Sequence, residues 1–183
     1  PADSSQGTQK TLRVMSFNLL AESKQSEEKW SESAKSCLKD WVPRRLRLLE
    51  ILLQETPDLI FLQELDMNGI ESALCPELKA AGYTAIFSTS SDSAAALFVR
   101  LGRFKILSEL SLDFVAVAVV QDLESRSQPQ PLVALASGHL KSGKTTEAEE
   151  ARSEQVTKLL DILKEQSADH VIFAGDLNAV SVT

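Results

Sequence analysis

The chain has 183 residues, of which 43% are hydrophobic and 25% are charged. This length and balance predict a soluble globular domain that buries a real core without disulfide or metal staples. The formal net charge of −7 and the pI near 4.9 argue against a stable duplex DNA partner, because non-specific DNA binding needs a basic face that releases counterions.

Local clusters of basic residues still allow a phosphate-bearing ligand. Such a ligand would be gripped at a pocket rather than along an extended basic surface. Taken alone, each cluster is more simply interpreted as a solvated face or loop. The candidates are Arg44, Arg45 and Arg47, then Arg100, Arg103 and Lys105, then Lys141 and Lys144.

Several features bear on the compartment. No apolar run has the length needed to cross a bilayer, and residues 1–11 lack the charged and then apolar pattern of a signal peptide. Cys37 and Cys75 are too few for a disulfide framework or a cysteine-based zinc site. We therefore expect an intracellular protein, most simply cytoplasmic, with an organelle left open and no membrane partner. The sequence does not indicate the oligomeric state.

Hydrophobic patterning divides the chain into alternating strands and helices. Residues 1–10 are rich in Ser, Gln and Asp and are expected to form a disordered tail, which leaves residues 11–183 as one domain. Consecutive strands in the middle of the chain predict hairpins, so we expect a layered α/β domain with a mixed sheet. A polar loop is expected at 21–40, strands at 11–20, 58–63, 83–87, 94–100, 105–110, 114–121, 132–137 and 168–178, and helices at 43–55, 69–81 and 145–166.

Proline and glycine set several of these boundaries. Pro43 suits the first turn of the first helix, and Thr56-Pro57 ends that helix because the residue before a proline resists the α conformation. Pro76 requires the second helix to start or restart there, and Gly82 is expected to close it as a C-cap.

Polar side chains come at or just after the ends of several predicted strands. Asn18 ends the first strand, Glu64 follows the second, and His139 follows 132–137. Asp176 and Asn178 are expected to project together from the last strand, since residues two apart share a side. Each has a structural explanation when taken alone, such as a turn or a solvent-facing loop. Because α/β sheets place ligands at strand ends, we expect them to meet.

This set of side chains predicts a particular chemistry. Oxygen ligands with few histidines select Mg²⁺ or Mn²⁺ over zinc. Magnesium takes one or two carboxylates and leaves its other positions to water and phosphate, which fits Glu64 with help from Asp176 or Asn18. A cation that neutralises a phosphoryl oxygen, an amide that orients water and a histidine that stabilises charge would together support phosphoester hydrolysis.

Five segments of the chain occur in a recognisable order. They are VMSFNLLA at 14–21, PDLIFLQE at 57–64, ALF at 96–98, GHLK at 138–141 and GDLNA at 175–179. In this order they resemble the endonuclease/exonuclease/phosphatase superfamily, and RSEQ at 152–155 adds a resemblance to its branch of nocturnin and poly(A) deadenylases. The resemblance spans nearly all of the chain from Leu12. It implies a two-sheet α/β sandwich of the deoxyribonuclease type, with mixed sheets flanked by helices.

The resemblance also implies a function and a set of roles. The function would be Mg²⁺-dependent phosphoester hydrolysis of RNA 3′ ends, such as poly(A), or of a nicotinamide dinucleotide phosphate. The alternatives are an inositol-phosphate or other phosphodiesterase of the superfamily, a DNA-repair nuclease, and an inactive binding fragment. By the family pattern Glu64 would bind the metal, and Asn18 and Asn178 would support the metal, phosphate or water. Asp176 would orient or activate the nucleophile, and His139 would contact the scissile phosphate. Lys141 and Arg152 would contact substrate phosphates.

Two departures from the superfamily pattern bear on these expectations. A late Asp and a final Ser-Asp-His motif have no counterpart, so we expect the domain to be incomplete at its C-terminus, with part of the catalytic apparatus beyond Thr183. The 88–95 region is short and lacks the usual Asp-Gly before Cys-Ala-Leu-Phe. Because that loop helps to choose the substrate in the superfamily, the choice between poly(A) and a dinucleotide stays open.

Overall fold

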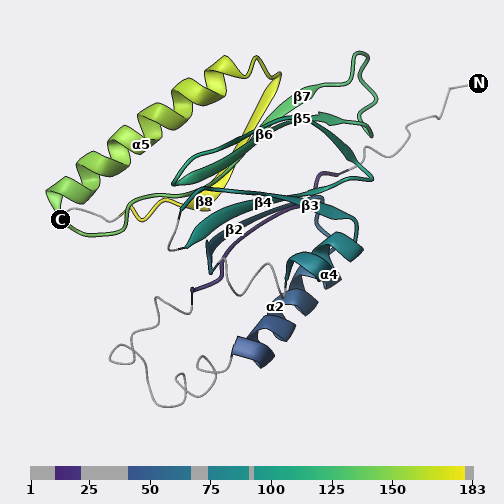
Figure 1. Ribbon diagram of the computed structural model, residues 1–183. Helices are drawn as coiled ribbons and strands as arrows, with labels where there is room; N and C mark the ends of the chain where they lie inside the picture. Colours follow the sequence, from purple (N-terminus) through teal and green to yellow (C-terminus); the bar gives the residue numbers. More distant parts are fainter. Residues whose placement is uncertain (1–10, 22–40, 67–73, 91–92, 180–183) are drawn as a thin grey trace, which may run out of the picture.

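A computed structural model describes residues 11–21, 41–66, 74–90 and 93–179. The predicted tail, nearly all of the predicted loop at 21–40 and the start of the predicted 69–81 helix lie outside these residues. Two four-stranded sheets face each other, with helices on their outer faces (Figure 1). The elements are β1 (Val14–Asn18), α2 (Trp41–Gln54), β2 (Leu59–Leu65), α4 (Cys75–Ala80), β3 (Tyr83–Phe87), β4 (Ala94–Arg100), β5 (Phe104–Ser111), β6 (Val115–Asp122), β7 (Leu132–His139), α5 (Thr146–Glu165) and β8 (His170–Asp176).

Each sheet combines parallel and antiparallel pairing. The first sheet has the order β1-β2-β4-β3, with β1 parallel to β2 and β4 antiparallel to both of its neighbours. The second has the order β5-β6-β7-β8, with antiparallel pairs up to β7 and a parallel pair between β7 and β8. The two-sheet sandwich expected from the resemblance is confirmed. Patterning alone predicted mixed pairing but did not separate two sheets, because pairing between distant strands leaves no local signal.

Side chains alternate along the strands and fill separate apolar layers. On β2, Leu59 and Phe61 point into the space between the sheets, while Ile60 and Leu62 point toward α2 and α4. Both faces of this strand are therefore buried, which explains its continuous apolar run. The second sheet repeats the pattern, with Ala116, Ala118 and Val120 between the sheets and Val115 and Val117 against α5.

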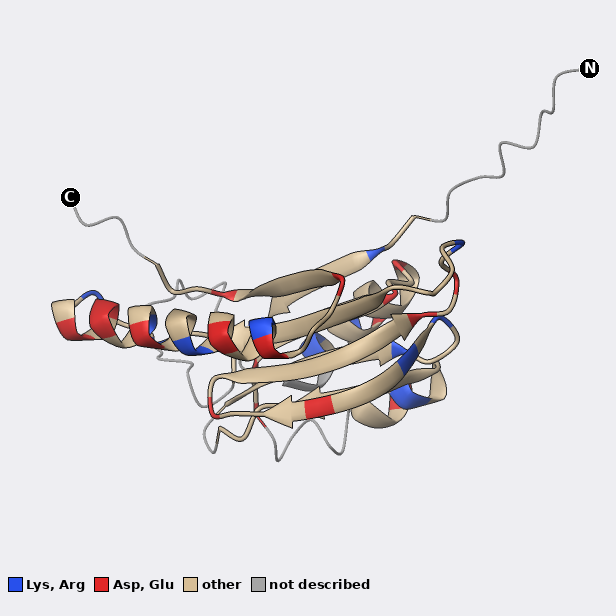
Figure 2. Cartoon of the chain, turned by 90° about the horizontal axis from the view of Figure 1, so that it is seen from above, with Lys and Arg blue, Asp and Glu red and all other residues tan. Residues whose placement is uncertain are grey.

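The helices cover the outer faces of the sandwich. Leu52 of α2 packs on the first sheet, and Leu159 and Leu163 of α5 pack on the second. Thr145 caps α5 by accepting the Ala148 backbone N–H. Charged residues gather on the helices and turns, and the strands carry few (Figure 2). None of the helices in the described ranges is long and apolar enough to span a membrane.

The main differences from the predicted elements fall at strand ends. β1 and β8 are shorter than predicted, whereas β2 continues through Leu65 and β7 through His139. Glu64 and His139 therefore belong to strands rather than follow them. The proline and glycine boundaries of α4 are confirmed, since Pro76 lies in its first turn and Gly82 follows it with φ 89°.

Candidate active site

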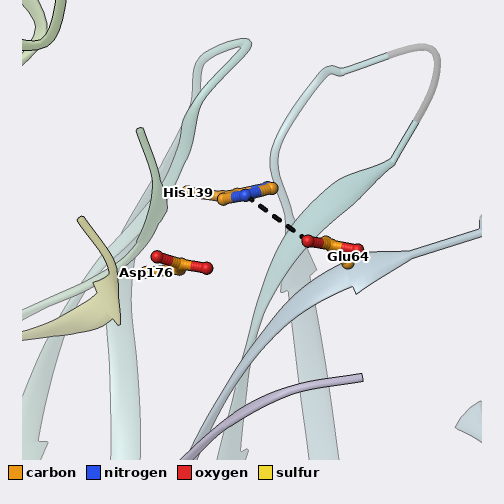
Figure 3. Close-up of side chains that lie close together, drawn as sticks. All are labelled: Glu64, His139 and Asp176. Carbon is orange, nitrogen blue, oxygen red and sulfur yellow. Dashed lines mark ion pairs between the residues drawn. The ribbon is translucent and has the colours of Figure 1, made fainter. Parts of the chain in front are cut away.

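The carboxyl ends of two parallel strand pairs meet at one end of the sandwich. In the first sheet Asn18 lies opposite Gln63, and in the second His139 lies opposite Asp176. The side chains of Glu64, His139 and Asp176 approach one another from the two sheets (Figure 3). One potential ligand atom from each lies within 4.8 Å of the others.

A β-bulge aims Glu64 into this cluster. Leu62 pairs with Ala96 and Leu65 with Ala94, so three steps along β2 match two along β4 and one residue of β2 is extra. Glu64 has φ 55°, a left-handed conformation that costs a non-glycine residue about 1 kcal/mol or more. This strained conformation turns the Glu64 carboxylate away from the buried faces of β2 and toward the site.

Hydrogen bonds hold the Glu64 carboxylate once it is turned. Oε1 accepts from Asn18 Nδ2 at 2.9 Å, and Oε2 accepts from the backbone N–H of Ala21 at 3.1 Å. Both donors belong to β1 or to the residues that follow it. The β1 end thus fixes the carboxylate of its neighbouring strand.

Two glycines let β7 and β8 come close enough to place His139 beside Asp176. Gly138 and Gly175 are partners in the parallel register, one residue before the two functional side chains. A Cβ on Gly175 would lie 2.0 Å from the Gly138 carbonyl oxygen. Only glycine fits there, which gives the Gly-His and Gly-Asp pairs of the sequence a steric reason.

Asn18 joins the carboxylates of the two sheets. Its Nδ2 donates to Glu64 Oε1 and to Asp176 Oδ2, both at 2.9 Å. Its Oδ1 accepts the backbone N–H of Leu20, which fixes the orientation of the amide. Asn18 therefore holds two carboxylates near each other although their charges repel.

Asn178 lies at the edge of the site and does not project alongside Asp176 as predicted. β8 ends at Asp176, and Asn178 turns back with φ 49°, so the alternation of a strand no longer applies. Its backbone N–H donates to Asp176 Oδ1, and its side-chain amide donates to the Leu140 carbonyl oxygen, both at 2.9 Å. The amide faces the end of β7 in this arrangement. A catalytic role for Asn178 stays a prediction.

Lys141 and Arg152 occupy contrasting environments. Lys141 is exposed, two residues beyond His139. Arg152 is 3% exposed, and its guanidinium donates to the carbonyl oxygens of Lys141 and Gly143 at 2.8 and 3.0 Å. The structure places Arg152 beneath the loop that carries Lys141. Contact of either residue with a substrate phosphate stays a prediction.

The carboxylates of the cluster have no arginine or lysine partner among the residues that the structure describes. The ionisable partner of Glu64 is His139, with Nε2 3.8 Å from Oε1 and side chains that are 16% and 15% exposed. Two neighbouring carboxylates in a partly buried site repel each other, and a divalent cation between them would relieve that repulsion. The two carboxylates and the imidazole therefore fit a metal ion.

Sequence patterning did not identify all the residues that support the site. Arg44 was considered only as part of a basic patch, yet its Nη1 donates to the backbone carbonyl oxygens of Leu19 and Leu20 at 3.4 and 2.9 Å. It ties the first turn of α2 to the segment after Asn18. Its position near a predicted helix start was visible, but its target depends on the path of a distant segment.

These observations define a two-sheet sandwich with an acidic cluster at its parallel strand ends, and sequence comparison agrees. The chain belongs to the Endonuclease/Exonuclease/phosphatase family, which it matches over residues 15–182. Among individual proteins, nocturnin of Mus musculus is 29% identical over 191 residues, which cover 92% of this chain and 43% of that protein. The chain thus spans less than half the length of this relative.

The solved structures that share the fold include two with bound ligands. The human nocturnin catalytic domain with bound sulfate anion aligns with a TM-score of 0.69 at 23% identity, covering 93% of this chain and 65% of that one. ANGEL2, a 2′,3′-cyclic phosphatase in complex with adenosine-2′,3′-vanadate, aligns with a TM-score of 0.77 at 18% identity, covering 93% and 54%. At these identities the structures establish a common architecture.

Proposed function

We propose that this chain provides the metal-binding part of a Mg²⁺-dependent phosphoester hydrolase of the nocturnin and deadenylase type. The observation that carries the proposal is the convergence of Glu64, His139 and Asp176, together with the lack of a basic partner for either carboxylate among the described residues. Membership of the Endonuclease/Exonuclease/phosphatase family supports the same reaction class.

The proposed substrate is an RNA 3′ end, such as poly(A), or a nicotinamide dinucleotide phosphate. The similarity to mouse nocturnin and the fold shared with a phosphatase solved with adenosine-2′,3′-vanadate support an adenosine-bearing phosphoester. The net charge of −7 supports a short substrate gripped at the site rather than a long duplex.

The residues of the cluster fit a bound Mg²⁺. Glu64 would hold the ion, with Asp176 adding a second oxygen, and Asn18 would keep the two carboxylates in place through its Nδ2. When bound, the ion would neutralise negative charge on a phosphoryl oxygen and so lower the barrier to displacement. Mn²⁺ has the same preference for oxygen donors and would be expected to substitute.

The remaining steps belong to side chains of this chain. Asp176 is oriented by Asn18 at one oxygen and by the Asn178 backbone N–H at the other, and in the proposed reaction it would align a water molecule and accept its proton. His139, fixed by the bond from its backbone N–H to the Phe114 carbonyl oxygen at 2.9 Å, directs Nε2 into the cluster. There it would stabilise charge on the phosphoryl group.

A substrate panel in the full-length protein tests the proposal. With Mg²⁺, we expect release of nucleoside monophosphate from an oligoadenylate or of inorganic phosphate from a nicotinamide dinucleotide phosphate. Asp176→Asn should reduce turnover by about a thousandfold or more, because it removes the proton acceptor. Asp161→Asn, in an exposed pair on α5, is the matched control and should keep full activity.

Two other outcomes would replace the proposal. Turnover of an inositol phosphate with neither nucleotide substrate hydrolysed would favour a different phosphoesterase of the same family. Mg²⁺ binding without turnover of any substrate in the panel would favour a binding function.

A further inference from the structure

The four-residue segment Leu140–Gly143, between β7 and α5, is held from two sides. On the β8 side, the Leu140 backbone N–H donates to the Asp176 carbonyl oxygen at 2.9 Å, and the Leu140 carbonyl oxygen accepts from the Asn178 side chain. On the other side lies α5. The segment therefore connects the candidate site to a helix that contributes no residue to the carboxylate and histidine cluster.

Arg152 makes the larger part of the connection to α5. Its Nη1 donates to the carbonyl oxygens of Lys141 and Gly143, and its Nε and Nη2 donate to Glu149 Oε2. The side chain of Arg152 is 4% exposed and its charge is balanced by the Glu149 carboxylate. A buried guanidinium whose charge is balanced and whose N–H groups make these four bonds serves to hold backbone carbonyls, and it is poorly placed to bind a phosphate.

Gln155 binds the backbone N–H of Lys141, whereas Arg152 binds its carbonyl oxygen. Gln155 Oε1 accepts this N–H at 2.8 Å. Gln155 lies three residues after Arg152, so both side chains leave the same face of α5. Together they fix the two peptide units that flank the Lys141 Cα, while the Lys141 side chain itself remains exposed.

We propose that Arg152 and Gln155 are positioning residues, which hold the Lys141 ammonium group at the edge of the active site and so set the affinity for substrate phosphate. The inference rests on the proposed function for its catalytic consequence. It replaces direct phosphate contact by Arg152 with an indirect effect through Lys141. Without these two side chains, the Lys-Ser-Gly sequence would lose three hydrogen bonds to its backbone, and Gly143, which is exposed with φ 130°, adds little conformational restraint of its own.

Backbone hydrogen exchange tests the positioning without any substrate. In the full-length protein, Gln155→Met removes the acceptor, and we expect faster exchange of the Lys141 amide with unchanged exchange in β6 and β7. Gln155→Glu keeps an acceptor oxygen and should restore protection. Glu154→Gln, at the exposed neighbouring position, is the matched control. Unchanged exchange of the Lys141 amide in Gln155→Met would overturn the inference even if the enzyme is inactive.

Steady-state kinetics test the catalytic consequence. With an oligoadenylate or a nicotinamide dinucleotide phosphate and Mg²⁺, Gln155→Met and Arg152→Met should raise KM by about tenfold and change kcat by less than about threefold. Arg152→Lys keeps the charge but lacks the fork, so it should not restore KM. If Arg152→Met does not fold, the Gln155 variants carry the test.

A double-mutant cycle separates positioning from direct contact. Because the effect passes through Lys141, adding Gln155→Met or Arg152→Met to Lys141→Met should raise KM no further. Additive effects would overturn the inference and favour independent contacts. Absence of turnover in the wild-type protein would count against the proposed function alone, since the exchange experiment still decides the positioning.

Discussion

At the end of the sandwich opposite the candidate site, Arg103 lies among three carboxylates. Its guanidinium is 2.8 Å from Asp58 Oδ2, 3.3 Å from Asp122 Oδ2 and 4.0 Å from Glu124 Oε2, with a side chain only 7% exposed. Burial alone would lower the pKa of Arg103, but the hydrogen bond to Asp122 and the surrounding negative charges raise it above its ordinary value. At this end of the molecule Asp58, Asp122 and Glu124 share one cationic partner.

At the site end, the same residue types have no such partner. Glu64 and Asp176 share an amide donor and approach an imidazole, and no arginine or lysine of the described ranges neutralises them. Repelling carboxylates destabilise a fold unless something else balances their charge. The difference indicates that the carboxylates around Arg103 stabilise the structure, whereas the carboxylates of the site are available to bind a cationic ligand.

Glu64→Gln should give the largest effect that tests this comparison. We expect turnover in the full-length protein to fall by about 10⁴-fold, because a charged metal ligand is lost. The free energy of unfolding without metal should change by less than about 1 kcal/mol, because the lost hydrogen bonding is offset by relief of repulsion with Asp176. Turnover assays and urea unfolding measure the two quantities.

The exposed residue Glu109 supplies the control for this substitution. Glu109→Gln on β5 should leave both turnover and stability unchanged. A Glu64→Gln protein that keeps its activity, or that loses as much stability as a core variant, would show that Glu64 is a structural residue like the carboxylates beside Arg103.

Arg103→Met should show the opposite pattern. It leaves Asp58 and Asp122 partly buried without their cation, so we expect a loss of about 3 to 5 kcal/mol in the free energy of unfolding. Turnover per folded molecule should be unchanged. Arg47→Met is the control, since the side chains of Arg47 and Glu50 are 66% and 59% exposed and such pairs contribute less than about 1 kcal/mol. Equal losses for the two variants would remove the distinction between the ends.

The contribution of Arg103 should not vary with pH around neutrality. Its pKa is raised in the folded protein, so the stability due to its charge is fully present below the ordinary arginine pKa. It would be lost only as pH rises through the raised folded value. Urea unfolding of wild type and Arg103→Met across the neutral range should therefore give a constant difference.

Asn18→Ala is expected to have the smallest effect of the three. It removes the donor shared by Glu64 and Asp176 but leaves both carboxylates in place. We expect a loss of about 1 to 3 kcal/mol in transition-state stabilisation, or roughly fivefold to 150-fold in kcat/KM. The apparent affinity for Mg²⁺, followed by the rise in Tm during titration, should weaken in parallel. Unchanged Mg²⁺ affinity and activity would mean that the carboxylates hold their positions without Asn18.

The central site could be predicted because its residues lie at strand ends. Asn18, Glu64, His139 and Asp176 all follow apolar runs, and parallel pairing brings such ends together. The bulge at Glu64 could not be predicted, since it depends on the register between β2 and a strand some thirty residues later. Local patterns also gave no basis for dividing the strands between two sheets.

Arginine environments were the least predictable feature. Arg103 was interpreted as a solvated surface residue, which is wrong, since it is 6% exposed. Its partners are Asp58, just before β2, and Asp122, at the end of β6, and no local pattern places them together. The target of Arg152 could not be predicted for the same reason, because the pattern that predicts a helix at 145–166 says nothing about the path of the segment after β7.

The bond from Asn18 to Asp176 crosses from one sheet to the other and joins residues 158 positions apart. Each sheet is formed by a continuous part of the chain, the first by residues 14–100 and the second by residues 104–176. Either half could in principle form its own strand pairs before the complete site exists. Metal affinity would then report docking of the two halves, and added Mg²⁺ would favour the docked state through mass action. The metal ion would thus stabilise the docked arrangement of the two halves, in addition to its role in catalysis.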